Sequence, residues 1–228
     1  MVLELRVAAL VTGGKDSTLA LYHSLKKGYY VKFLVTMMPQ REDSWMFHYP
    51  NIHLAELFAE AVGLPLVKEN TLGVKELELE DLKRLLEKLD VEGVVYGAIS
   101  SQYQKSRIEK ICKELKLKPI APLWQENPKK LLQEILDLKF KVIIVGVYAY
   151  GFNISWLGRE IDEKAVQELE ELNRQHGISL IGEGGEYETL VVDAPFFKRS
   201  ISLIETEKIW KGESGYLVIK KAKLIPKS

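Results

Sequence analysis

The first half of the chain alternates short apolar runs with segments whose apolar residues recur at helical spacing. The apolar runs, typical of buried strands, are residues 5–11, 30–38, 64–70 and 93–99. The helical segments that follow them lie at about residues 17–28, 54–63, 82–89 and 108–115. Strands that alternate with helices form a parallel sheet with helices on both faces. We therefore predict a doubly wound α/β fold for this half.

Beyond residue 117 the pattern changes, and we place a domain boundary there. The segments expected in the second half are a helix at 129–138, a strand at 141–150, a charged helix at 162–175 and two strands within 200–225. A Gly-Glu-Ser-Gly turn, residues 212–215, joins these two strands. The sequence thus predicts a first domain, residues 1–117, and a second, smaller mixed α/β domain, residues 118–228.

The composition narrows the class of protein. Of the 228 residues, 32 are lysine or arginine and 32 are aspartate or glutamate, so the net charge is zero. Nothing in the overall charge indicates a nucleic-acid coat or a membrane-surface protein, while a local basic patch stays open. The single cysteine, Cys112, excludes an internal disulfide or a CxxC site, and we expect it in the core. The sequence lacks a membrane-length apolar run and a basic leader, so we expect a cytoplasmic protein without a membrane partner.

A glycine turn, "TGGKDS" at residues 12–17, separates the first strand from the first helix. Two glycines let successive backbone N–H groups point into one concavity, and a helix starting near Asp16 or Ser17 adds its N-terminal amides. Such a turn suits a phosphate or another anion. A P-loop is excluded, because it needs a glycine where Ala9 stands and a serine or threonine where Asp16 stands. The alternative is a tight turn with Asp16 or Ser17 as a helix N-cap.

Three unusual loops follow strands of the predicted parallel sheet: residues 12–17, 36–51 and 96–109. Ligands of open parallel sheets bind at the carboxyl ends of the strands, so these loops are expected to share one edge. In the third loop Gly97 permits close backbone approach. Its hydrogen-bond donors are Ser100, Ser101, Tyr103, Gln104 and Arg107. Alternatively, Ser100 is the N-cap of the following helix and Arg107 is a solvated side chain. The apolar loop 36–51 could be a lid, a base-stacking surface or a plug over the end of the sheet.

The second half contains one unusual segment, "GEGGEYETLVVDAPFF" at residues 182–197. It places Glu183, Glu186 and Glu188 among three glycines. Carboxylates that lie close together repel one another, so they need a cation, a donor network or a role in proton transfer. The alternative is a glycine-rich surface loop with solvated acids.

These segments resemble known signatures. "TGGKDS" is similar to the pyrophosphate loop of the N-type ATP pyrophosphatases, the PP-loop enzymes, whose Rossmann-like fold of the adenine nucleotide alpha hydrolase type is a doubly wound sheet. Residues 96–124 and 182–197 resemble signatures of one branch, the diphthine–ammonia ligases. This resemblance covers nearly the whole chain. It implies a ligase that uses ATP, Mg²⁺ and ammonium to amidate diphthine on translation elongation factor 2, through an acyl adenylate, yielding diphthamide, AMP and pyrophosphate.

The resemblance also implies roles for individual residues. The ATP-binding residues would be Thr12, Gly13, Gly14, Ser17, Thr36, Met37, Gly97, Ala98, Ser100 and Ser101. The residues facing the acceptor substrate would be Tyr103, Gln104, Arg107, Tyr187 and Thr189. The catalytic residues would be Lys15, Asp16, Glu183, Glu186 and Glu188. Asp16 would position Mg²⁺ or hold the loop, and the three glutamates would bind the trimethylammonium group of diphthine, bind ammonium or deprotonate it.

The sequence departs from the family pattern at Thr12, where serine is usual, and at Ala98, where many relatives carry an acid. It contains neither a glutaminase domain nor an N-terminal cysteine, so the nitrogen source would be ammonium. Two other functions stay open: another PP-loop adenylating enzyme, such as a tRNA-modifying one, and a non-catalytic nucleotide sensor. The net charge and the missing thiolation cysteines argue against tRNA, so no direct nucleic-acid binding is expected. A homodimer is left open.

Overall fold

The computed structural model describes residues 4–39, 51–72 and 77–227, and contacts group the chain into two compact units. The first unit consists of Asp16–Trp124 and the residues before Gly13. The second unit contains everything after Trp124, together with the short segment Gly13–Lys15. In the described ranges, no helix is long and apolar enough to cross a membrane.

The first unit is built on a five-stranded parallel sheet in the order β3-β2-β1-β4-β5. Its strands are β1 (Arg6–Leu10), β2 (Tyr30–Pro39), β3 (Leu66–Thr71), β4 (Gly93–Val95) and β5 (Lys118–Ile120). The strand order reverses between β1 and β4, which is where open α/β sheets bind ligands. This arrangement confirms the predicted parallel α/β fold.

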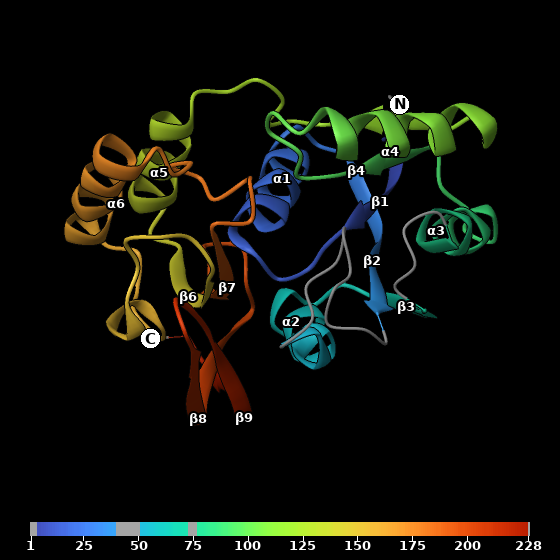
Figure 1. Cartoon of the computed structure of the whole chain (residues 1–228). Helices are drawn as coiled ribbons and strands as arrows, with labels where there is room; N and C mark the ends of the chain where they lie inside the picture. The colour runs from blue at the N-terminus through green and yellow to red at the C-terminus, as the bar shows by residue number, and fades with distance from the viewer. Residues whose placement is uncertain (1–3, 40–50, 73–76, 228) are drawn as a thin grey trace. The chain divides into compact units, whose positions relative to one another are not determined.

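Four α-helices connect these strands: α1 (Lys15–Lys26), α2 (Ala55–Val62), α3 (Leu77–Glu87) and α4 (Gln102–Glu114), with a short 3₁₀ helix η1 (Ile52–Leu54) before α2. They cover both faces of the sheet, with α3 and α4 on the same side (Figure 1). Helix α2 ends where the sequence predicted, because Gly63 takes the left-handed conformation that ends it.

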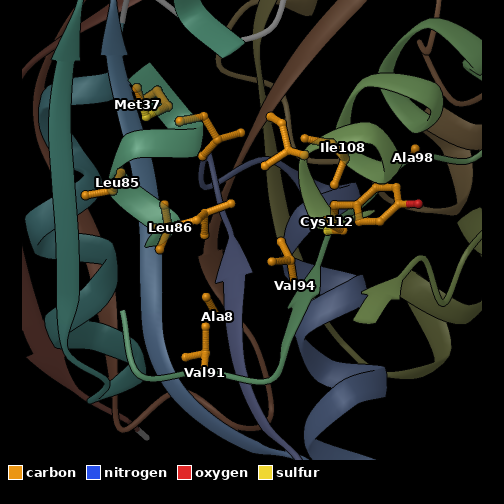
Figure 2. Packing of buried hydrophobic residues seen from close by; sticks show 13 residues of the cluster. Ala8, Met37, Leu85, Leu86, Val91, Val94, Ala98, Ile108 and Cys112 are labelled. Atoms are coloured by element: carbon orange, nitrogen blue, oxygen red, sulfur yellow. The ribbon is translucent and has the colours of Figure 1, made fainter. Parts of the chain in front are cut away.

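One hydrophobic cluster of the first unit lies between the sheet and the helices α3 and α4. Ala8 of β1 and Val94 of β4 pack against Leu86 of α3 and Ile108 of α4 (Figure 2). Cys112 lies in the same cluster and is 0% exposed, so it is a core residue, as expected. Burial, followed by the nearby charge of Glu109, raises the pKa of its thiol to about 12.

The second unit carries an antiparallel four-stranded sheet in the order β7-β6-β9-β8. Its strands are β6 (Lys141–Val147), β7 (Tyr187–Asp193), β8 (Arg199–Lys211) and β9 (Ser214–Pro226). Its helices are α5 (Pro128–Asp137), η2 (Ile154–Trp156) and α6 (Glu163–His176). The predicted helices and the final hairpin are confirmed, but Ser214 and Gly215 pair within β9, so the turn is shorter than the predicted 212–215. The strand predicted at 141–150 ends at Val147, and β7 was not predicted as a strand.

Two segments differ from the expected division of the chain. β5 follows residue 117 but pairs with β4 in the first sheet. The segment Gly13–Lys15 groups with the second unit by its contacts, although its flanking residues belong to the first. The domain boundary at residue 117 itself stays a prediction.

Candidate functional site

The glycine turn at residues 13–15 lies against β7. Gly13 has φ +82°, a left-handed conformation that glycine adopts without steric cost. Its carbonyl oxygen accepts a hydrogen bond from the Val191 N–H at 2.8 Å. The Lys15 N–H donates to Oγ1 of Thr189 at 3.1 Å. The turn is therefore fixed to β7 by both a backbone and a side-chain hydrogen bond.

The Lys15 side chain is enclosed, with 2% of the residue exposed. Its Nζ donates to the Ile181 carbonyl oxygen at 2.5 Å and lies 5.0 Å from the centre of the Tyr187 ring. A carbonyl dipole and an aromatic face both stabilise a positive charge removed from water. The structure thus joins Lys15 to Tyr187 and Thr189, which come from the other signature segment.

The glycine-rich segment before β7 is folded around the carboxylate of Glu186. Gly182 and Gly185 have φ of +70° and +84°, and a Cβ on Gly184 would lie 2.8 Å from Oε1 of Glu186. This Oε1 accepts the Ser179 N–H at 2.9 Å. The other carboxylate oxygen, Oε2, is buried and has no hydrogen-bond partner in the described part of the chain. The segment is therefore a structured turn that holds one acid in place.

The three glutamates occupy different surroundings. Side chains alternate along a strand, so Tyr187 and Thr189, which both contact Lys15, share one face of β7 and Glu188 lies on the other. Glu183 is half-buried in the turn. No group of three or more His, Cys, Asp or Glu side chains in residues 4–39, 51–72 and 77–227 is placed to hold a metal ion.

In the first unit, the end of β4 packs directly against the first turn of α1. A Cβ on Gly97 would lie 2.7 Å from the Ser17 nitrogen and 2.8 Å from the Asp16 carbonyl carbon. Real Cβ atoms do not come this close to backbone atoms, so any other residue at position 97 would force the two segments apart. The Ser17 hydroxyl also accepts the Thr12 N–H at 3.3 Å. The residues after β1 and after β4 therefore meet at the same edge of the sheet, as the loop positions predicted.

Ser100 is not the N-cap of α4, which was the alternative considered for it from the sequence. The N-cap of α4 is Ser101, whose hydroxyl accepts the Gln104 N–H at 3.3 Å, whereas Ser100 is exposed. The guanidinium of Arg107 lies 3.5 Å from the centre of the Tyr103 ring, and its Nη1 donates to the Tyr103 carbonyl at 3.4 Å. Arg107 is therefore a packed, partly buried side chain and not simply a solvated one.

Thr36 and Met37 lie inside β2. The Thr36 hydroxyl donates to the Val11 carbonyl at 2.6 Å, and the Met37 side chain is buried in the core cluster. The pairing of β1 with β2 ends at Leu10 and Val35, so the backbone of residues 36–39 extends beyond it. Ala98 is buried. The apolar loop residues Trp45, Met46, Phe47 and His48 lie outside the described residues.

Some residues at this site were not identified from the sequence. Ile181, Ser179 and Val191 contribute main-chain groups, which no side-chain pattern reveals. Tyr148 follows β6, and its N–H donates to the Glu186 carbonyl at 2.8 Å. The only sequence signal for Tyr148 was its position at the end of an apolar strand, where loops often carry function.

Comparison with known proteins places both halves of the chain in one family. Residues 5–119 match the diphthamide synthase N-terminal domain, and residues 127–225 match the diphthamide synthase C-terminal domain. The chain is similar to diphthine–ammonia ligase of Bos taurus, at 37% identity over 90% of this chain and 85% of that protein. It is also similar to the proteins of that name from Mus musculus, at 36% identity over 93% and 88%, and Homo sapiens, at 36% identity over 90% and 85%.

Proposed function

Because this chain belongs to the diphthamide synthase family, we propose that it amidates diphthine on translation elongation factor 2, using ATP and ammonium. The resemblance predicted from the sequence is confirmed, and the chain is a ligase that forms a C–N bond. Both the nucleotide and the protein acceptor belong to the cytoplasm, so the cytoplasm is the proposed location.

One observation carries the proposal beyond the family match. The phosphate-binding turn and the glutamate segment, which are 174 residues apart at Lys15 and Thr189, are joined by hydrogen bonds. An adenylating ligase needs this proximity, because the group that holds the leaving pyrophosphate must lie near the groups that handle the acceptor. A non-catalytic nucleotide sensor does not require this proximity. The tRNA-modifying alternative, which would also adenylate its substrate, is less well supported because both halves of the chain match the diphthamide synthase domains.

The reaction has two steps. In the first, a carboxylate oxygen of diphthine attacks the α-phosphorus of ATP, the bond to the β-phosphate oxygen breaks, and pyrophosphate leaves. In the second, ammonia attacks the carbonyl carbon of the acyl adenylate and AMP leaves. Negative charge develops on the departing pyrophosphate, and the amides of Gly13 and Gly14, the Ser17 hydroxyl and the Lys15 ammonium stabilise it. The backbone near Thr36 and Met37 binds adenine, and Gly97, Ala98, Ser100 and Ser101 line the ribose and α-phosphate.

The donor set fits Mg²⁺ bound together with the nucleotide. Magnesium in nucleotide enzymes takes one or two protein carboxylates, with substrate phosphates and waters as the other ligands. Asp16, half-buried in the first turn of α1, supplies one carboxylate. When bound, the ion neutralises charge on the phosphates.

Glu186 is the residue that accepts a proton from ammonium. Ammonium is mostly protonated at neutral pH, so a base must act before it can attack. Hydrogen bonding to Ser179 fixes Oε1 of Glu186, while Oε2 is buried with no hydrogen-bond partner among the described residues. A fixed carboxylate oxygen with unused acceptor capacity suits a small cation that carries N–H donors. Glu183, Tyr103, Gln104 and Arg107 serve the protein acceptor.

The test is to incubate the purified chain with ATP, ammonium and elongation factor 2 that bears diphthine. Mass spectrometry should show a loss of about one mass unit from the factor, because a hydroxyl is replaced by an amino group. AMP and pyrophosphate should appear in equal amounts. The Lys15→Met variant, which keeps the length of the apolar stem but lacks the charge, should show little turnover.

Reactions without ammonium, with glutamine in its place, or with factor lacking diphthine are the controls. Formation of ADP in place of AMP would contradict adenylation. Nucleotide binding without any diphthine-dependent release of pyrophosphate would favour the sensor alternative.

A further inference from the structure

The ring of Tyr148 lies over Gly146 on β6. A Cβ built on Gly146 would lie 2.6 Å from the Tyr148 hydroxyl oxygen and 2.8 Å from its Cε2. The missing side chain of Gly146 is thus what makes room for the ring. At the same time 42% of Tyr148 is exposed, so one part of this large aromatic residue faces solvent.

Two further side chains flank this ring. Gly146 is paired across the sheet with Glu188 of β7 on one side and with Tyr216 of β9 on the other. Directly paired residues of antiparallel strands point to the same face of a sheet, about 5 Å apart. The carboxylate of Glu188 and the ring of Tyr216 therefore lie on the face that Tyr148 covers. Both are partly exposed.

The electrostatics agree with this placement. The pKa of the Tyr148 hydroxyl lies above its ordinary value, because of burial first, then the charge of Glu188, and then Tyr216. The hydroxyl end of Tyr148 is buried because it lies over Gly146, whereas another part of the residue is exposed. A negative charge beside two aromatic rings makes this position favourable for a cation.

A quaternary ammonium group needs such surroundings. It has no N–H, so hydrogen-bond acceptors cannot recognise it directionally, whereas aromatic rings and a carboxylate attract it through its charge. Diphthine, the acceptor under the proposed function, carries a trimethylammonium group on the same carbon as its reacting carboxylate.

We propose that Tyr148, Tyr216 and Glu188 form the recognition site for the trimethylammonium group of the acceptor. This assignment rests on the proposed function and separates Glu188, which binds the methylated cation, from Glu186, which takes the proton. It makes Tyr148 and Tyr216 specificity residues: they distinguish the trimethylated side chain from one with fewer methyl groups.

A binding experiment without catalysis tests the site directly. The whole chain, with isotope-labelled tyrosines, is titrated with betaine, a small trimethylammonium carboxylate, and in parallel with glycine, which has the same carboxylate and no methyl groups. Betaine should shift the ring signals of Tyr148 and Tyr216, glycine should leave them unchanged, and Tyr148→Leu should abolish the response. Betaine that shifts neither signal would overturn the proposal.

A kinetic experiment tests the same site in the reaction. Tyr148→Leu should raise KM for the diphthine-bearing factor about 3- to 30-fold, the range that corresponds to one cation–aromatic contact. Tyr148→Phe should stay near wild type, because it keeps the ring. Tyr150→Leu is the matched control, since Tyr150 is 68% exposed two residues further along and should leave KM unchanged.

The two experiments separate this inference from the proposed function. If betaine binds but the wild-type chain does not amidate the factor, the cation site stands and the proposed function fails. If the wild type amidates the factor and a folded Tyr148→Leu variant keeps its KM, the proposed function stands and the cation site is wrong. The melting temperature of each variant shows whether it is folded.

Discussion

Lys15 and Glu186 both carry buried polar atoms, but their hydrogen-bond partners differ. The Lys15 ammonium is held by the Ile181 carbonyl and the Tyr187 ring, which compensate for lost water. Glu186 has one carboxylate oxygen hydrogen-bonded to Ser179, and the other buried oxygen has no partner in the described residues. A buried polar atom without a partner costs free energy, so its presence in a structured turn points to a ligand that supplies the missing hydrogen bond.

We predict that Glu186→Gln lowers the rate of amidation by about 100-fold or more, because the amide cannot accept a proton. The fold should survive, since the amide oxygen of glutamine can still accept the Ser179 N–H. Quantified diphthamide formation at saturating ATP and ammonium measures the effect. Glu213→Gln, in the exposed hairpin turn between β8 and β9, is the control with the same chemical change. Turnover near wild type in Glu186→Gln would show that another group is the base.

Cys112 gives a second prediction at the level of one residue. A thiol with a pKa of about 12 is ionised roughly a thousand-fold less at pH 8 than one with a pKa of 9.0, and this thiol is also 0% exposed. Iodoacetamide should therefore leave the native chain unlabelled and label it once in strong denaturant, as mass spectrometry can show. Rapid labelling of the native chain would contradict its place in the core.

In the first unit, one close approach between the backbone after β4 and the first turn of α1 brings candidate site residues together. β1 and β4 are neighbours in the sheet, so the residues that follow them meet, and Gly97 is where the backbone after β4 touches the first turn of α1. The residue type at position 97 therefore controls the spacing of two elements.

We predict that Gly97→Ala destabilises the protein by about 1–3 kcal/mol and weakens ATP binding, because the added Cβ displaces the first turn of α1. Gly28→Ala is the comparison. Its Cβ would meet nothing within 4 Å, so only the backbone strain at φ +79°, about 1–2 kcal/mol, applies. Urea unfolding and ATP titration measure both properties. Equal ATP affinity in the two variants would show that the approach at Gly97 does not shape the nucleotide site.

Across the whole chain, the glycine turn at residues 13–15 makes hydrogen bonds to residues near the other end of the sequence. Gly13–Lys15 groups with the second unit through hydrogen bonds to Val191, Thr189 and Ile181. The turn is therefore held by β7 as well as by the strand and helix that it connects in sequence.

We predict that Thr189→Val, which keeps the shape but removes the acceptor for the buried Lys15 N–H, destabilises the protein by about 1–3 kcal/mol. It should also raise KM for ATP, because the turn is less firmly fixed. Thr189→Ser keeps the hydroxyl and should stay close to wild type in both properties. Chemical unfolding and steady-state kinetics provide the measurements. A similar KM for ATP in the two variants would argue that this hydrogen bond does not support nucleotide binding.

Local patterns in the sequence determined most of the elements and the family. The alternation of apolar runs with helical stripes predicted the parallel sheet, and Gly63 and Gly177 marked helix ends because left-handed backbone favours glycine. Two strands escaped prediction: β5, which has three residues and contains Pro119, and β7, which directly follows a glycine-rich turn. Strands of this kind are defined by their partners more than by their composition.

Only the tertiary structure decided which chemically active groups lie together. It joined Lys15 to Tyr187 and Thr189, placed Glu188 on the opposite face of β7 with Tyr148, and made Ser101 rather than Ser100 the cap of α4. The physical reason is that these contacts involve main-chain atoms and the pairing register of strands far apart in sequence. Residue type and spacing specify which elements form, whereas the register of long-range pairing specifies which side chains share a face.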